Sequence, residues 1–155
     1  MNNPINRDKT LKPLSREHHQ SLLLCWKIRT GLRKKVDVSL IKSYVDWFYK
    51  NHVQSHFELE EKHVFSILGK EHELVKRALA EHRKLRRLFK EENEVVKNLG
   101  LIEEKLEAHI RFEERILFME IQKFATLEQL EEMEKMHFEL DSLKKPEEWK
   151  NEFWK

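Results

Sequence analysis

Two pairs of side chains that can bind a metal ion occur at the same spacing in the sequence. His56 and Glu60 lie four residues apart, and His109 and Glu113 repeat that spacing. In a helix this spacing places both side chains on one face, with about 6 Å between their Cβ atoms. Imidazole nitrogens and carboxylate oxygens are ligands for iron, manganese and zinc, so each pair can offer two donors to one metal cluster.

Two further histidines lie on apolar faces of expected helices. In a helical projection His82 and His18 fall among apolar residues at i, i+3 and i+4 spacing. These neighbours are Val75, Ala78, Leu79, Leu85 and Phe89 for His82, and Leu14, Leu22 and Cys25 for His18. Burying so many polar groups costs several kcal/mol unless each is paired, and a metal cluster at the centre of a helical bundle would satisfy them.

The sequence therefore predicts a metal site but no separate catalytic residue. The predicted ligands are His18, His56, Glu60, His82, His109 and Glu113. A carboxylate can bridge two metals, which gives that role to Glu60 and Glu113 and leaves the histidines as terminal ligands. Cys25 is the single cysteine, and this argues against a structural zinc cage of thiolates.

Four segments around these residues resemble the hemerythrin-like (HHE cation-binding) family. Residues 56–61 (HFELEE) and 109–114 (HIRFEE) resemble its repeated signature of histidine, three residues and two glutamates. Glu17-His18 and Glu81-His82 resemble its other two histidine positions, and the likeness extends from about residue 14 to 124. The resemblance implies two non-haem iron ions with an oxo or hydroxo bridge. Members of this family carry oxygen, sense oxygen or iron, or interact with nitric oxide or peroxide.

One departure from the family pattern bears on function. Oxygen-carrying members have a fifth histidine one turn from the third-helix ligand, and here the matching positions hold Ala78 and Arg86. The resemblance then implies an additional open coordination position, which favours redox chemistry, signalling or metal handling over reversible oxygen carriage. We expect a metal-binding or sensing protein rather than a dedicated enzyme, with a small diatomic molecule or peroxide as its ligand. Manganese would suit the same donors.

The elements that must position these residues are helices. Gly 3 and Pro 3 leave few turn formers in 155 residues, whereas good helix formers dominate. We expect an all-α, antiparallel up-down-up-down four-helix bundle with a short additional C-terminal helix. The expected helices span about 15–35, 71–97, 101–124 and 126–143, and a second helix that begins after residue 37 or 39 carries apolar residues from 41 to 68. A flexible arm at 1–13 precedes the domain at 14–143, and a charged tail at 144–155 follows, with aromatic residues that can fold back on the bundle.

Specific residues mark the expected helix ends and buried faces. Asp37 or Ser39 can cap the second helix, Gly69 ends it, and Thr126 with Gln129 resembles a capping box. We expect a break at residues 98–100, between the third and fourth helices. Val96, Ile116 and Phe124 are among the apolar side chains expected to be buried.

Composition excludes some classes of function. Lys+Arg 30 against Asp+Glu 28 gives a net charge of +2, and the charges are interleaved, so nothing indicates nucleic-acid binding. No apolar run approaches the roughly 20 residues of a membrane span, and the first residues lack the apolar segment of a secretory signal. We expect a cytoplasmic protein, either a monomer or a homodimer.

Several alternatives stay open at this stage. His19 could replace His18, and His52 or His63 could lie beside the site, whereas His72 and His137 are interpreted as structural. Tyr49 could reach a bound ligand, although packing is the commoner role. A ferritin-like di-iron oxidase is the second hypothesis, based on Glu60-x-x-His63 and Glu134-x-x-His137. A bundle that binds a partner and no metal is the third.

Overall fold

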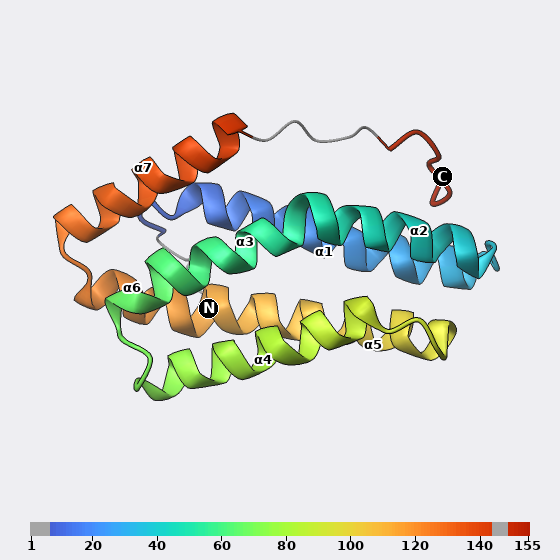
Figure 1. The fold of residues 1–155 in the computed structure, drawn as a ribbon, viewed down its shortest axis with the longest axis horizontal. Helices are drawn as coiled ribbons and strands as arrows, with labels where there is room; N and C mark the ends of the chain where they lie inside the picture. The colour runs from blue at the N-terminus through green and yellow to red at the C-terminus, as the bar shows by residue number, and fades with distance from the viewer. Residues whose placement is uncertain (1–6, 144–148) are drawn as a thin grey trace, which may run out of the picture.

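The described part of the chain is helical, and Figure 1 shows its long helices lying side by side. The computed structural model describes residues 7–143 and 149–155, and within them no strand occurs. The first bundle helix is α1 (Lys12–Arg33), and the third is α4 (Glu73–Lys90). The second contains α2 (Val38–Phe48), η1 (Tyr49–Val53), α3 (Gln54–Leu59), η2 (Glu60–Val64) and η3 (Phe65–Ile67). The fourth contains α5 (Val95–Phe112), η4 (Glu113–Leu117) and α6 (Phe118–Phe124).

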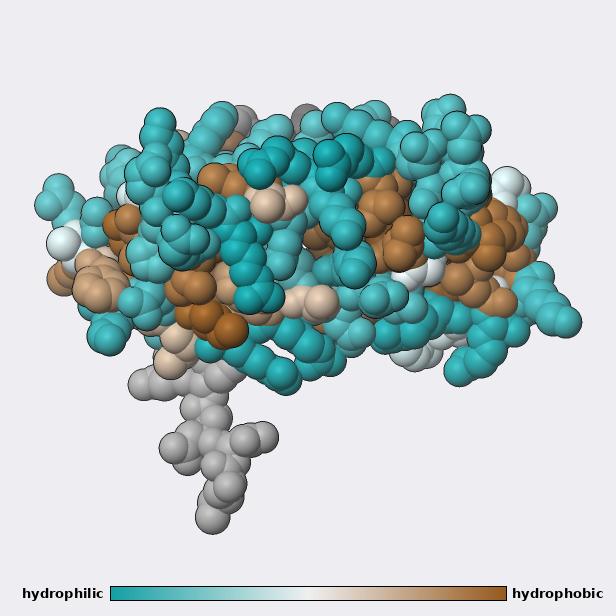
Figure 2. Space-filling model, turned by 90° about the horizontal axis from the view of Figure 1, so that it is seen from below, coloured by the Kyte–Doolittle hydropathy of each residue, from teal (hydrophilic) through white to brown (hydrophobic). Residues whose placement is uncertain are grey.

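These four bundle helices, each called a rod below, form an up-down-up-down bundle, and α7 (Leu127–Leu143) is the additional helix. α1 packs against α5 and α2, while α4 packs against α5 and α2. α7 turns back beside the second rod and contacts η2 (Figure 1). Figure 2 shows that hydrophilic side chains cover most of the face on the α4 side, with smaller apolar patches between them. The expected fold class is confirmed.

Local sequence signals explain most of the helix ends. Asp37 caps α2 by accepting a hydrogen bond from the backbone N–H of Ser39 at 2.9 Å. Gly69, with φ of 89°, follows the second rod in the left-handed conformation that glycine adopts without strain. Thr126 and Gln129 each accept a hydrogen bond from the other's backbone N–H, at 3.1 and 2.9 Å, which is the expected capping box.

The break between the third and fourth rods lies earlier than the sequence predicted. α4 ends at Lys90 and α5 begins at Val95, so Asn98 and Gly100 are inside a helix and the predicted break at 98–100 is wrong. The buried Asn98 donates from Nδ2 to the carbonyl oxygen of Asn93 at 2.8 Å, which anchors the start of α5 instead of ending a helix. Val96 is consequently 57% exposed rather than buried.

The apolar interior consists of two clusters, and the predicted ligands lie along the helices between them. Leu24, Val53, Leu85 and Leu106 belong to the first cluster. Leu14, Leu59, Ala78 and Phe112 belong to the second. Each bundle rod thus passes from one cluster to the other within a few residues of its histidine. A polar layer therefore crosses the middle of the bundle.

The chain ends pack against this bundle where the structure describes them. At the N-terminal end, Leu11 is fully buried and Asp8 accepts hydrogen bonds from Thr10, although residues 1–6 of the expected arm lie outside the described part. At the other end the rings of Trp149, Phe153 and Trp154 surround Tyr44. Residues 144–148 of the expected tail are likewise outside the description. No helix in the described residues has the length and apolar character that crossing a membrane requires.

Candidate metal centre

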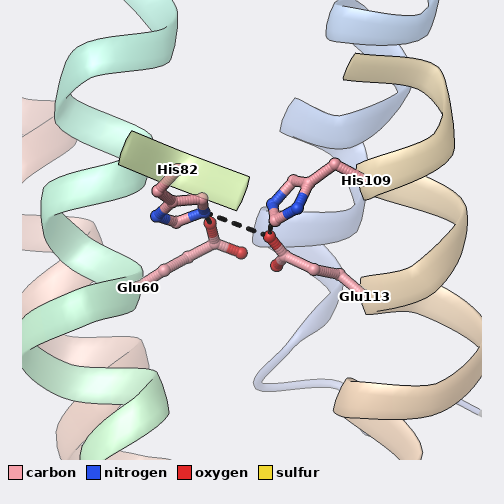
Figure 3. Close-up of side chains that lie close together, drawn as sticks. All are labelled: Glu60, His82, His109 and Glu113. Carbon is pink, nitrogen blue, oxygen red and sulfur yellow. Dashed lines mark hydrogen bonds and ion pairs between the residues drawn. The ribbon is translucent and has the colours of Figure 1, made fainter. Parts of the chain in front are cut away.

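The six predicted ligands meet in the polar layer. Each side chain comes from a bundle rod, and none of the six residues is more than 6% exposed. They are His18 on α1, His56 on α3, Glu60 at the start of η2, His82 on α4, His109 on α5 and Glu113 at the start of η4. Figure 3 shows four of them, with the carboxylates of Glu60 and Glu113 pointing toward each other and toward the imidazoles.

All four histidines direct Nε2 at the two central carboxylates. His82 Nε2 lies 3.3 Å from Oε1 of Glu60 and 3.3 Å from Oε1 of Glu113. His18 Nε2 lies 3.5 Å from Oε2 of Glu60 and 3.6 Å from Oε2 of Glu113. Each glutamate therefore offers one oxygen toward His82 and the other toward His18. His56 Nε2 is 3.2 Å from Oε1 of Glu60, and His109 Nε2 contacts Oε1 of Glu113.

These donors form two groups that share Glu60. One group consists of Glu60, His82, His109 and Glu113, and the other of His18, His56 and Glu60. Within each group one ligand atom per residue lies within 4.8 Å of all the others. Buried groups of imidazoles and carboxylates on facing helices of a bundle are donor sets that could hold metal ions.

Several inward-facing atoms have no hydrogen-bond partner among the described residues. They are Nε2 of His18, His56 and His109, both carboxylate oxygens of Glu60, and Oε2 of Glu113. A buried polar atom without a partner costs about 1–3 kcal/mol of folding free energy, so several such atoms would destabilise the folded bundle. Cations at the centre would satisfy all of them, and the nitrogen and oxygen donors suit iron or manganese.

The outer nitrogen of every predicted ligand histidine also has a partner, and that partner is a glutamate from the preceding rod around the bundle. Nδ1 of His56 lies 2.8 Å from Glu17, and Nδ1 of His82 lies 2.7 Å from Glu61. Nδ1 of His109 lies 2.7 Å from Glu81, and Nδ1 of His18 lies 2.8 Å from Glu114. We call Glu17, Glu61, Glu81 and Glu114 the outer glutamates. A carboxylate that accepts from Nδ1–H fixes the ring and keeps Nε2 available for a metal.

Sequence reasoning did not assign the outer glutamates a role, although a signal was present. Glu17 and Glu81 directly precede a predicted ligand histidine, and Glu61 and Glu114 directly follow a predicted ligand glutamate. Adjacent residues on a helix point about 100° apart, so such a pair cannot face the same metal. Each outer glutamate instead contacts the ligand histidine of the next rod around the bundle.

The close carboxylates change the proton affinities of the imidazoles. Burial lowers the pKa of His18, but the hydrogen bond to Glu114 and the nearby Glu60 outweigh it and raise that pKa to about 9. Burial also lowers the pKa of His56, whereas attraction to Glu60 and the hydrogen bond to Glu17 raise it to about 10. Burial raises the pKa of Glu60, and the charge of His56 brings it well below its usual value. Without a metal, protons on the imidazoles balance the buried carboxylates.

Both central glutamates begin a π-helical turn, which the sequence did not predict. η2 starts at Glu60 and η4 starts at Glu113, and π-turns inside α-helices are frequent at functional sites. The wider turn changes the phase of the residues that follow. Ile116 is therefore 46% exposed while Leu117 and Phe118 are buried, and Phe124, near the end of α6, is 59% exposed. The predicted burial of Ile116 is wrong for this reason, whereas that of Phe124 is wrong because this residue ends α6, beyond the last buried residue of the helix, Ile121.

The remaining histidines lie away from the central carboxylates. His19 is exposed, so the structure brings His18 rather than His19 to the centre. The ring of His52 contacts those of Trp47 and Phe48. His63 lines a surface hollow between η3 and α7, and His72 caps α4 by accepting from the backbone N–H of Leu74.

The other residues that the sequence singled out also have structural surroundings. Tyr49 stacks on Phe89 with 4.7 Å between ring centroids. Cys25 is fully buried in the first apolar cluster, and burial raises the pKa of its thiol to about 12. Ala78 is buried among apolar residues, and Arg86 pairs with Glu61 at 2.8 Å, so neither position adds a nitrogen donor to the centre.

The comparison with protein-family models identifies the class of protein. Residues 10–121 match the hemerythrin HHE cation-binding domain, which covers most of the chain and both rods that carry the paired signatures. The chain therefore belongs to this family of metal-binding helical bundles. Neither the curated proteins nor the solved structures contain a significant match.

Proposed function

We propose that this protein holds two non-haem iron ions between its four rods and uses them to sense or react with dioxygen, nitric oxide or peroxide. The observation that carries the proposal is the pair of donor groups that share Glu60. His82, His109 and Glu113 would complete the position on one side of it, and His18 and His56 the position on the other. Glu113 would bridge as well, because its two oxygens face His82 and His18.

The surroundings of the centre support redox chemistry in a dry site. Phe57 stacks on His82 with 3.9 Å between centroids, and Phe118 stacks on His18 at 5.3 Å. These rings exclude bulk water from the imidazoles, while the outer glutamates fix the orientation of each ring. An iron pair supplies electrons and open coordination positions for a small oxidising molecule.

The donor set favours sensing or reaction over reversible oxygen carriage. The positions that would supply a fifth histidine are the buried Ala78 and Arg86, whose guanidinium pairs with Glu61. One iron would therefore keep an additional position for an incoming ligand. With one histidine ligand fewer, that iron would be held less tightly and its occupancy would depend on iron supply. Iron sensing therefore belongs to the same proposal.

The ferritin-like alternative has less support. It requires His63 and Glu134 as ligands, yet neither belongs to a group of possible metal donors in the described residues. It also leaves the inward Nε2 atoms of His56 and His109 without a function.

The experiment is anaerobic titration of the iron-loaded, reduced protein with nitric oxide, dioxygen and peroxide, followed by absorption and electron paramagnetic resonance spectroscopy. We expect nitric oxide to change the spectra in proportion to bound iron, and dioxygen or peroxide to oxidise the centre. Removal of dioxygen should not restore the reduced spectrum. Full recovery on removal would indicate reversible carriage instead, and iron that none of the three molecules affects would contradict the proposal.

A further inference from the structure

Each outer glutamate has a second side-chain contact besides its ligand histidine, and the residue that makes this contact differs. Glu61 pairs with Arg86 at 2.8 Å, Glu81 with Arg77 at 3.0 Å, and Glu114 with Arg7 at 3.6 Å. In each case an arginine holds the carboxylate that accepts from a predicted ligand histidine.

The contacts of Glu17 include two histidines. Its Oε1 is hydrogen-bonded to Nδ1 of His56 at 2.8 Å and lies at an ion-pair distance of 3.1 Å from Nε2 of His137, without hydrogen-bond geometry. His137 contacts Glu17 as an arginine contacts each of the other three outer glutamates.

His137 comes from a part of the chain that the family match does not include. It lies on α7, whereas the matched region ends at residue 121. α7 docks through Leu130 and Met133, which belong to the second apolar cluster, and His137 itself is 6% exposed. Its other ring nitrogen, Nδ1, lies 3.6 Å from Oδ2 of Asp141 one turn later. Carboxylates therefore flank the ring at both nitrogens.

α7 also closes the space beside His56. The hollow between α7 and the bundle has a volume of about 10 Å³ and is lined by Glu17, His56, His137 and Asp141 among others. That volume is near the minimum for a single water. Without His137, water could enter this space and compete for the carboxylate of Glu17, which is 25% exposed.

We propose that His137 is a positioning residue of the metal centre, which holds Glu17 against Nδ1 of His56. Through this contact α7 would fix the orientation of one of the four ligand histidines. The inference rests on the proposed metal-binding function. The proposal gives His137 on α7 the role that Arg86, Arg77 and Arg7 have at the other three outer glutamates. His56 is the ligand whose orientation depends on this helix.

The test compares iron release from three variants with release from the wild-type protein. His137→Ala removes the contact, and His137→Gln places an amide N–H near the position of Nε2. Lys135→Ala is the matched control, because it removes an exposed cation from the same helix. After loading and reduction, a ferrous chelator measures the rate of iron loss. We expect release from His137→Ala to be faster, within the roughly 10–100-fold range that loss of the direct partner of a ligand histidine produces. His137→Gln should recover most of the wild-type rate, and Lys135→Ala should match the wild type.

A second measurement separates positioning from docking of the helix. In the metal-free protein, ¹⁵N-edited NMR reports the Nδ1 proton of each buried histidine. His137→Ala should lose or shift the His56 signal and leave those of His82 and His109 unchanged. Thermal unfolding of the same variants shows whether α7 still packs.

The outcomes that overturn the inference are distinct. Equal iron release and an unchanged His56 signal in His137→Ala would remove the positioning role. Equal defects in His137→Ala and His137→Gln would assign the effect to helix packing. An additional metal ion that only His137→Ala loses would show that Glu17, His137 and Asp141 form a cation site of their own. If the wild-type protein binds no metal, the proposed function fails, and the NMR measurement still tests the His137–Glu17–His56 contact.

Discussion

Glu81 on α4 accepts a hydrogen bond from Nδ1 of His109 on α5, with 2.7 Å between the two atoms. The adjacent residue, His82, points about 100° away around the helix and directs its Nε2 at the central carboxylates. One dipeptide thereby supplies an inner donor from its own rod and an outer partner to the next rod. Glu17-His18 repeats the arrangement at the other half of the bundle.

This relationship predicts the effect of Glu81→Ala. Without the carboxylate, the ring of His109 loses the partner that fixes its tautomer and orientation, so metal affinity should fall by about 10–100-fold. Competition with a chelator of known affinity measures the change. Glu104→Ala is the control, because its side chain is 67% exposed. An affinity that falls equally in both variants would contradict the role of Glu81.

The predicted inner ligands should have larger effects. His56→Ala and His109→Ala each remove one donor from a different group, so both variants should lose most bound iron while helix content stays. Metal analysis and circular dichroism measure the two quantities. His19→Ala, which removes an exposed histidine beside His18, should retain its iron. Unchanged iron in both inner variants would remove the site assignment.

The metal-free protein should become less stable as pH rises. The pKa values of His18 and His56 are raised in the folded state, to about 9 and about 10. Their contribution is therefore fully present below about pH 6.5, the unfolded value, and is lost as pH rises through the folded values. Urea unfolding of the metal-free protein from pH 6 to 10 measures this. A free energy of unfolding that increases over the same interval would contradict the charged imidazole network.

Phe57 should be a major contributor to stability. It is 2% exposed, its ring stacks on His82 at 3.9 Å, and the guanidinium of Arg86 lies 5.5 Å from its centroid. Phe57→Ala should lower the free energy of unfolding by about 3–5 kcal/mol, from lost burial and the resulting cavity. Phe138→Ala, at a position 74% exposed, should change it little. Denaturant unfolding of both variants tests the difference, and similar values for the two would show that Phe57 is not a core residue.

The sequence predicted the parts of the centre that follow regular helical geometry. The i, i+4 pairs His56/Glu60 and His109/Glu113 could be placed on buried faces because four residues are close to one turn. The structure brings both pairs together with His18 and His82. Their role as metal ligands stays a prediction until metal is measured.

Other features depend on tertiary contacts that no local pattern records. The π-turns at Glu60 and Glu113 leave no signature in residue type, so the phase of Ile116 could not be predicted. Asn98 and the nearby glycine are typical of a helix break, yet a hydrogen bond to Asn93 makes the asparagine part of a helix start. The contact between His137 on α7 and Glu17 on α1 could likewise not be predicted, because it depends on how the additional helix packs against the bundle.

The most direct test of the central claim is elemental analysis of aerobically purified protein together with its absorption spectrum. Two donor groups sharing Glu60 predict about two iron ions per chain and the near-ultraviolet bands of a histidine-rich bridged iron pair. Protein that folds as a helical bundle, contains less than about one metal ion per chain after loading with iron or manganese, and lacks those bands would contradict the account.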